Sequence, residues 1–243
     1  MARLHARWLT IWQGRDVSES AQILVKPRIS GSLVPMNRPR ISCNLAISAD
    51  GKISSANHRP STWTSESDHQ RLKDLRKGAD ALMVGRGTAE TDRMTLTAEG
   101  GQPLRCIVSR HGELSIDHPI FHAEGGAIHL LATEGYRGNH GGKATIHEAS
   151  VTEFLATLHD DLGIELLHCE GGGQLIRELA ELDAIDELHL TLAGHSLLGG
   201  AESPTLSGML SEYLKSSKSF EISEFQPQPE TGECFLSYRR KDQ

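Results

Sequence analysis

The chain has 243 residues, of which 37% are hydrophobic, and its formal net charge is −7. Its length suits one large domain or two small ones, and its acidic balance argues against a nucleic-acid-binding protein. No apolar run is close in length to the roughly 18–20 residues that a membrane helix needs. The four cysteines lie far apart without a C-x-x-C pair, which favours a reducing compartment over a disulfide framework. We therefore expect a cytoplasmic protein with no nucleic-acid or membrane partner.

The chain divides into two stretches of different character. Residues 1–37 are weakly patterned and contain many turn formers. We treat them as an N-terminal extension of unknown order. Regular patterning begins next, so we predict a single domain over residues 38–243.

Strand and helix patterns alternate along this domain. The predicted strands span residues 41–48, 79–85, 103–109, 127–133, 143–149, 164–170 and 186–194. The predicted helices span residues 65–78, 151–163 and 172–183. Two further strands, 219–225 and 234–240, are separated by the turn-forming residues 226–233 and form a closing hairpin. The alternation predicts an α/β fold: a central, mostly parallel mixed sheet flanked by helices, with a C-terminal β-hairpin and ligand sites at the carboxyl ends of its strands.

One glycine motif follows the strand at 79–85. Gly85-Arg86-Gly87-Thr88 is followed by Asp92. The glycines would admit a phosphate or ribose while Thr88 donates its hydroxyl. The alternative is a tight strand-to-helix turn capped by Thr88, and the residues alone do not decide between the two. The motif lacks the third glycine of a dinucleotide fingerprint and the G-K-[ST] of a P-loop.

A second motif, Glu170-Gly171-Gly172-Gly173, follows the strand at 164–170. Glycine loses more conformational freedom on folding than other residues, so three in succession indicate a close approach to the main chain. We favour a cofactor lying against bare backbone, with Glu170 contacting a polar substrate edge. The alternative is a packing crossover, in which the helix passes close to a neighbouring strand.

Other chemistry-bearing residues have simple structural explanations when each is taken alone. Asp50-Gly51 is a common turn pair, Trp63 is an ordinary anchor, and Arg76 complements a helix C-terminus. The spacing of the 13 histidines matches no metal site, and there is no G-x-S-x-G nucleophile motif. We predict no metal.

The order of these stretches is more specific than any one of them. "NLAISADGKI", "STWTS", "LKDLRKGADALMVGRGTAETDRMTLT", "PLRCIVS", "IELLHCEGGGQLIREL" and "DELHLTLAG" follow one another. Over residues 38–240 this series resembles the reductase domain of riboflavin biosynthesis, which has a dihydrofolate-reductase-like fold. The resemblance implies an oxidoreductase that uses NADPH to convert the ribosyl group of a ribosylaminopyrimidine 5′-phosphate to ribityl, by hydride transfer to C1′ of the sugar.

The resemblance also assigns residues by position. The implied cofactor residues are Ala46, Trp63, Gly85, Gly87, Thr88, Asp92, Gly171, Gly172, Gly173 and Gln174. The implied substrate residues are Ser61, Arg76, Leu96 and Glu170, and the implied catalytic residues are Asp50 and Glu170. Asp50 would assist proton movement near the sugar. Gly171-Gly172 matches a di-glycine whose peptide bond is often cis in that fold.

One departure bears on the substrate. Where the family has an arginine that helps to hold the substrate phosphate, this chain has Glu99, and a carboxylate repels a phosphate. Either Arg93, Arg86 or Arg105 replaces that arginine, or the substrate is another small molecule such as a pterin or a carbonyl compound. A non-catalytic nucleotide-binding paralogue is a third alternative. Family members commonly pair, so we expect a homodimer.

Overall fold

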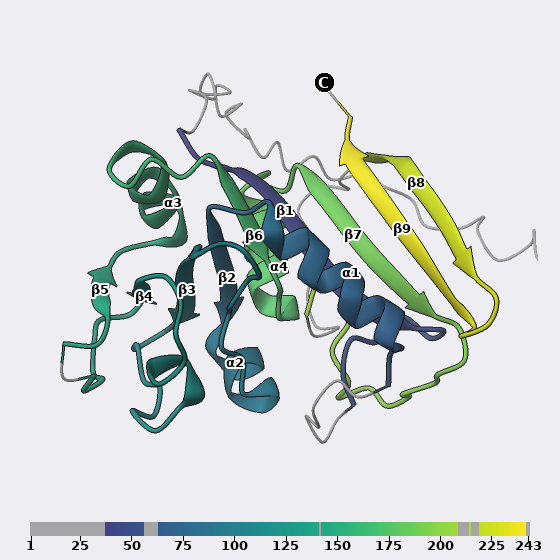
Figure 1. Ribbon diagram of the computed structural model, residues 1–243, viewed down its shortest axis with the longest axis horizontal. Coiled ribbons are helices and arrows are strands. Elements are labelled where there is room, and N and C mark those ends of the chain that lie inside the picture. The colour runs from purple at the N-terminus through teal and green to yellow at the C-terminus, as the bar shows by residue number, and fades with distance from the viewer. Residues whose placement is uncertain (1–36, 56–62, 141, 209–213, 215–218, 242–243) are drawn as a thin grey trace, which may run out of the picture. The chain divides into compact units, whose positions relative to one another are not determined.

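The computed structural model describes residues 37–55, 63–140, 142–208, 214 and 219–241 (Figure 1). Residues 36–243 belong to one compact unit. Nearly all of the predicted N-terminal extension and the predicted substrate residue Ser61 lie outside the described residues. Among the helices within these ranges, none is long and apolar enough to cross a membrane.

The described part of the chain forms a nine-stranded sheet in the order β5-β4-β3-β2-β6-β1-β7-β9-β8. Its strands are β1 (Arg40–Ser48), β2 (Ala81–Gly85), β3 (Leu104–Ser109), β4 (Ile128–Ala132), β5 (Thr145–Glu148), β6 (Leu166–Cys169), β7 (Glu187–Ala193), β8 (Phe220–Gln228) and β9 (Glu233–Arg240). Strands β1 to β7 pair in parallel, whereas β9 pairs antiparallel with β7 and with β8. The predicted α/β class, the mostly parallel sheet and the closing hairpin are confirmed.

Four α-helices and one short 3₁₀ helix accompany this sheet in the described ranges. They are α1 (Glu66–Lys77), α2 (Arg86–Asp92), α3 (Val151–Asp160), α4 (Gly173–Glu181) and the 3₁₀ helix η1 (Pro119–Phe121). The buried apolar residues of helices α3 and α4 belong to one hydrophobic cluster with Ile41, Cys43 and Leu45 of β1. Since successive residues of a strand point to opposite faces, Ser42 and Asn44 point to the other face, which α1 covers (Figure 1).

Local signals in the sequence set the ends of two helices. The Ser65 side chain caps α1 by accepting from Asp68 N. Ser150 and Glu153 form a reciprocal capping box at the start of α3. Helix α3 ends at Asp160, three residues before the end of the predicted helix at 151–163, and Leu162 beyond it is 39% exposed.

Two other elements differ from their predictions. Helix α2 follows β2 directly, and its N-cap is Gly85 without a side-chain hydrogen bond, so Thr88 is not the cap. Strand β8 continues to Gln228 instead of turning at residue 226. Pro227, which pairs with Cys234, lies on an edge strand, where a residue without an N–H group is tolerated.

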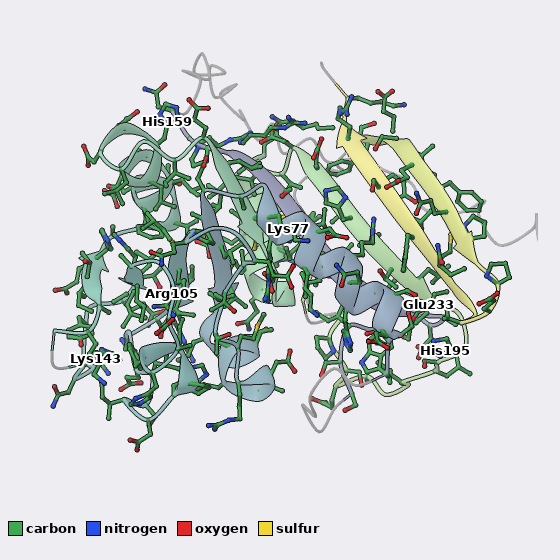
Figure 2. All side chains as sticks on the ribbon, viewed as in Figure 1. Lys77, Arg105, Lys143, His159, His195 and Glu233 are labelled. Atoms are coloured by element: carbon green, nitrogen blue, oxygen red, sulfur yellow. The ribbon has the colours of Figure 1, made fainter. Side chains whose placement is uncertain are left out.

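Helix α1 is held over the sheet largely by polar contacts. Thr191 Oγ1 donates to Asp68 Oδ1 at 2.5 Å, and Arg71 Nη2 donates to Ser237 Oγ at 3.1 Å. At the start of α1, Glu233 of β9 accepts from the backbone N–H of Ser65 at 2.7 Å; Figure 2 labels Glu233. These contacts fix the helix that carries Arg76.

Candidate active site

The carboxyl ends of β1, β2, β3 and β6 border a cavity of about 800 Å³. Its lining includes these predicted site residues: Ala46, Trp63, Gly85, Gly87, Thr88, Asp92, Glu170, Gly172, Gly173 and Gln174. Asp50, Arg76, Leu96 and Gly171 are predicted site residues that do not line it. The two glycine motifs, 85 residues apart in sequence, therefore meet in one cavity, as the parallel strand order requires.

The tips of β2 and β6 touch through bare backbone. Gly85 N donates to Gly171 O at 2.7 Å, and the peptide bond between Gly171 and Gly172 is cis, as the resemblance implied. A Cβ at Gly172 would lie 2.6 Å from Thr88 Oγ1, which is closer than nonbonded carbon and oxygen atoms come in proteins. A side chain at this position would therefore compete for the space in front of Thr88.

The third glycine of the second motif has a different neighbour. A Cβ at Gly173 would lie 2.7 Å from both Gly208 N and Thr205 O. The packing explanation that we considered for the motif therefore describes Gly173. By contrast, a Cβ at Gly87 would have no neighbour within 4 Å, so packing does not demand that glycine.

Glu170 is bound by Arg76 at the tip of β6. Arg76 Nε and Nη2 donate to Glu170 Oε1 and Oε2, each at 2.6 Å. The two side chains are 14% and 3% exposed. Arg76 Nη1 also donates to Thr97 O at 3.2 Å. The structure thus brings two predicted substrate residues into contact with each other, and Glu170 is the one that reaches the cavity.

Asn44 is a cavity residue that the sequence analysis missed. It follows Cys43, which pairs with Cys169, so Asn44 stands beside Glu170 at the cavity. Its Oδ1 is buried and has no hydrogen-bond partner among the residues that the structure describes. A polar residue inside an otherwise apolar strand pattern was the available signal.

Asp50 lies outside the cavity lining, in the turn after β1. Its carboxylate accepts from Ser48 Oγ at 2.5 Å and from the N–H groups of Gly199 at 2.7 Å and Leu198 at 3.2 Å. These hydrogen bonds lower the pKa of Asp50 from 3.8 to about 2. The group is therefore ionised at neutral pH, and its oxygens already have donors.

The Leu96 side chain is fully buried and packs in an apolar cluster with Leu82 and Ile107. Its φ of 51° is unusual for a residue other than glycine. Its side chain therefore cannot contact a molecule in the cavity.

The candidates for the missing phosphate arginine have different surroundings. Arg105 (labelled in Figure 2) is 5% exposed and donates from Nε to Gly126 O at 2.7 Å and from Nη1 to Ile120 O at 3.0 Å, so it is committed to the fold. Arg86 lines the cavity. Arg93 is exposed. Glu99 pairs with Lys77 at 3.2 Å.

A third strand tip contributes polar residues that the sequence analysis also missed. Ser109, Arg110 and His111 at the end of β3 and Thr133 after β4 line the cavity. His111 Nδ1 lies 3.3 Å from Gly135 O. The signal was available, because polar residues directly follow the predicted strand at 103–109, but they match no short motif.

The mostly parallel sheet, the antiparallel hairpin at its edge and a cavity lined by glycines across its strand tips define the dihydrofolate-reductase-like class of α/β proteins. Dihydrofolate reductase of Enterococcus faecalis superposes with a TM-score of 0.52 at 18% identity, over 84% of this chain and 97% of that one. The chain belongs to the family of the RibD C-terminal domain, which matches residues 39–224. The resemblance and fold expected from the sequence are confirmed.

Two relatives carry the likeness further. The 2,5-diamino-6-ribosylamino-4(3H)-pyrimidinone 5′-phosphate reductase of Archaeoglobus fulgidus is 29% identical over 191 residues, which are 70% of this chain and 86% of that protein. The deaminase and 5-amino-6-(5-phosphoribosylamino)uracil reductase of Thermotoga maritima superposes with a TM-score of 0.71 at 24% identity. The match covers 84% of this chain and 57% of the Thermotoga chain.

Proposed function

We propose that this protein is the NADPH-dependent reductase of riboflavin biosynthesis that converts the ribosyl group of a ribosylaminopyrimidine 5′-phosphate to ribityl. The observation that carries the proposal is the cavity of about 800 Å³ that joins Glu170 to the glycine-lined tips of β2 and β6. Family membership and the name of the Archaeoglobus relative support the same substrate class.

The cavity suits a dinucleotide on physical grounds. Gly172 and Thr88 both line the cavity, and Gly172 has no side chain of its own, so a flat or charged group can contact its main chain. We propose that Ala46, Trp63, Gly85, Gly87, Asp92 and Gln174 also bind NADPH at this position. Gly171 and Gly173 support the same backbone.

The tip of β3 suits the far phosphate of the cofactor. Sheet order places β2 between β3 and β6, so Ser109 and Arg110 lie on the opposite side of Gly85 from Glu170. A guanidinium and a hydroxyl bind phosphate oxygens well, and Arg86 lines the same cavity. We propose that these residues bind the anionic end of NADPH.

The substrate would occupy the part of the cavity near β1 and β6. NADPH supplies a hydride when it is bound. Glu170 accepts hydrogen bonds from ring N–H or amino groups of the pyrimidine, and Arg76 holds that carboxylate in place. Asp50 is held by the turn outside the cavity lining, so we assign it no proton transfer. Ser61 remains a predicted substrate residue outside the described ranges.

Glu99 supports an alternative substrate. It stands at the family's arginine position and pairs with Lys77 (labelled in Figure 2). Arg105, one of the candidates to replace that arginine, is buried. A reductase of the same fold acting on a pterin or another small carbonyl compound therefore remains the second candidate.

An NADPH-oxidation assay distinguishes the two candidates. The purified protein is mixed with NADPH and, separately, with the diamino pyrimidine ribosyl phosphate, its deaminated form and a dihydropterin. Oxidation with either pyrimidine, and formation of the ribityl product, supports the first proposal. NADPH binding without turnover of either pyrimidine would exclude it.

We also propose three properties of the whole protein. The reductase domain begins near residue 38; the family match from residue 39 supports this boundary. The protein forms a homodimer, supported by Ile222 and Phe225, which are 54% and 62% exposed on the edge strand β8. It works in the cytoplasm, supported by its four free cysteines.

A further inference from the structure

The turn after β1 contacts a segment that is distant in sequence. We call residues 48–53 the anchor turn and residues 194–208, which follow β7, the wall segment. The N–H of Ala49 donates to Ser196 O at 2.9 Å, and the N–H of Ile53 donates to Pro204 O at 3.0 Å. These two backbone hydrogen bonds join the anchor turn to the wall segment at two separate places.

Asp50 binds the first half of the wall segment. Its two carboxylate oxygens accept from Leu198 N and Gly199 N, and Ser48 Oγ supplies a third donor. Hydrogen bonds to an ionised carboxylate are stronger than hydrogen bonds between neutral groups. Gly199 has a φ of 61°, a conformation that turns the chain there.

Lys52 binds the second half. Its side chain is largely buried, with the residue 8% exposed, and its Nζ donates to Ser203 O at 3.1 Å. Its backbone forms an antiparallel bridge with Thr205. Burying an ammonium group is costly unless it gains polar contacts, so this lysine holds the segment at a defined place.

The end of the wall segment closes on α4. Thr205 and Gly208 exchange backbone hydrogen bonds of 2.8 and 3.0 Å, and both lie so close to Gly173 that a Cβ there would be 2.7 Å away. Pro204 and Gly208 line the same cavity as Gly172 and Gly173. Movement of the wall segment would therefore change the shape of the cavity at the proposed cofactor site.

We propose that Asp50 and Lys52 are positioning residues that fix the wall segment against α4 and thereby shape the cofactor cavity. This inference rests on the proposed use of NADPH. It assigns Asp50 a role in cofactor affinity, in contrast to the proton transfer that the family resemblance suggested. It also gives a function to Lys52, which the proposed reaction does not use.

The test measures NADPH affinity and turnover in the same variants. NADPH is titrated against the tryptophan emission of the protein, to which Trp63 in the cavity lining contributes, and steady-state kinetics are measured over a range of pH. The variants are Lys52→Met, Lys52→Arg, Asp50→Ala and Asp50→Asn, of which Asp50→Asn retains the shape of the turn. Lys73→Met and Asp117→Ala change exposed residues of matching charge and serve as controls.

We expect the Kd and KM for NADPH to rise about tenfold in Lys52→Met and Asp50→Ala, the effect of losing one or two hydrogen bonds. Turnover at saturating NADPH and its pH profile stay close to those of the unchanged protein. Lys52→Arg restores most of the affinity because its guanidinium can also donate to Ser203 O. The two controls bind NADPH normally.

Unchanged NADPH affinity in folded Lys52→Met and Asp50→Ala would overturn the inference, even if their melting temperatures fall. Loss of turnover and of one limb of the pH profile in Asp50→Asn, at unchanged affinity, would return Asp50 to proton transfer. Failure of the unchanged protein to bind NADPH would instead remove the proposed function, and the inference with it.

Discussion

Arg76 and Glu170 form a two-point ion pair that joins helix α1 to the tip of β6, with both donor–acceptor distances at 2.6 Å. The carboxylate is 3% exposed, so water can compensate its charge only weakly. Arg76 also holds Thr97 O. The residue that faces the proposed pyrimidine is therefore fixed and neutralised by one that does not reach the cavity.

Replacing Arg76 with methionine should leave Glu170 as an uncompensated buried charge. We expect the free energy of unfolding to fall by about 3–5 kcal/mol, the usual cost of removing one partner of a buried pair. The KM for the pyrimidine should rise more than the Kd for NADPH. Urea denaturation and steady-state kinetics measure the two effects.

The double variant Arg76→Met/Glu170→Gln provides the control, because it removes both charges. Its stability should recover most of the loss, while its KM for the pyrimidine stays high. If Arg76→Met alone is as stable as the unchanged protein, the pair does not hold Glu170 in the way that we describe. Equal effects on pyrimidine and NADPH would place Arg76 outside the substrate side of the site.

Substitution of Gly172 tests the backbone surface at the tip of β6. A Cβ there would lie 2.6 Å from Thr88 Oγ1, so Gly172→Ala should weaken NADPH binding by at least about tenfold, or about 1.4 kcal/mol. Gly172→Val should abolish it, because a β-branched side chain is larger and stiffer. Isothermal titration with NADPH measures both.

The matched control is Gly78→Ala, since a Cβ at Gly78 would meet nothing within 4 Å and the residue lies outside the cavity lining. Its NADPH affinity should be unchanged. Normal affinity in Gly172→Val, with the fold retained by circular dichroism, would refute the cofactor placement.

His168 predicts how stability depends on pH. Burial, with the positive charges of His189 and Arg76, lowers the pKa of His168 from 6.5 to about 3. In the unfolded chain His168 therefore binds a proton below about pH 6.5, whereas in the folded protein it binds one only below about pH 3. Stability is lost as pH falls through this window, by about 1.4 kcal/mol per pH unit for each such proton.

The variant His168→Gln should flatten this dependence. Urea midpoints measured between pH 7 and pH 4 should fall less steeply in the variant than in the unchanged protein. His159→Gln is the control, because the His159 side chain on α3 is 41% exposed. An identical slope in His168→Gln and the unchanged protein would show that His168 is not the group responsible.

The sequence predicted the strands well because each is a short apolar run between turn formers, and parallel order then brings the tips of β2 and β6 together. It could not predict the pairing of Arg76 with Glu170, because that contact joins residues 94 positions apart. Nor could it reveal that Asp50 binds Leu198 and Gly199. A turn pair such as Asp50-Gly51 carries no information about distant backbone donors.

Arg105 illustrates the same limit from the other side. In sequence it is a candidate phosphate ligand near Glu99, and burial alone distinguishes it from Arg86. Its guanidinium binds carbonyl groups of the 120–126 stretch, a loop whose course no local pattern specifies. Only the folded structure therefore shows that Arg105 is a structural residue while Arg86 lines the cavity.

The amino-terminal edge of the sheet gives a last prediction, because it should affect stability without affecting the site. Asp186 accepts from the N–H of Ile41 at 2.8 Å and from Arg38 at 2.5 and 2.9 Å, and Arg240 lies 3.1 Å away. Asp186→Ala would leave two arginines without their shared partner. We expect a loss of about 2–3 kcal/mol, since the group is 21% exposed and partly screened. Chemical denaturation should show this loss while NADPH titration gives an unchanged Kd, because Ile41 lies near the start of β1 and the cavity at its end. A higher Kd for NADPH would mean that the amino-terminal edge of the sheet affects the cavity at the opposite edge. A loss of stability below about 0.5 kcal/mol would mean that Asp186 and its arginines contribute no more than an ordinary surface ion pair.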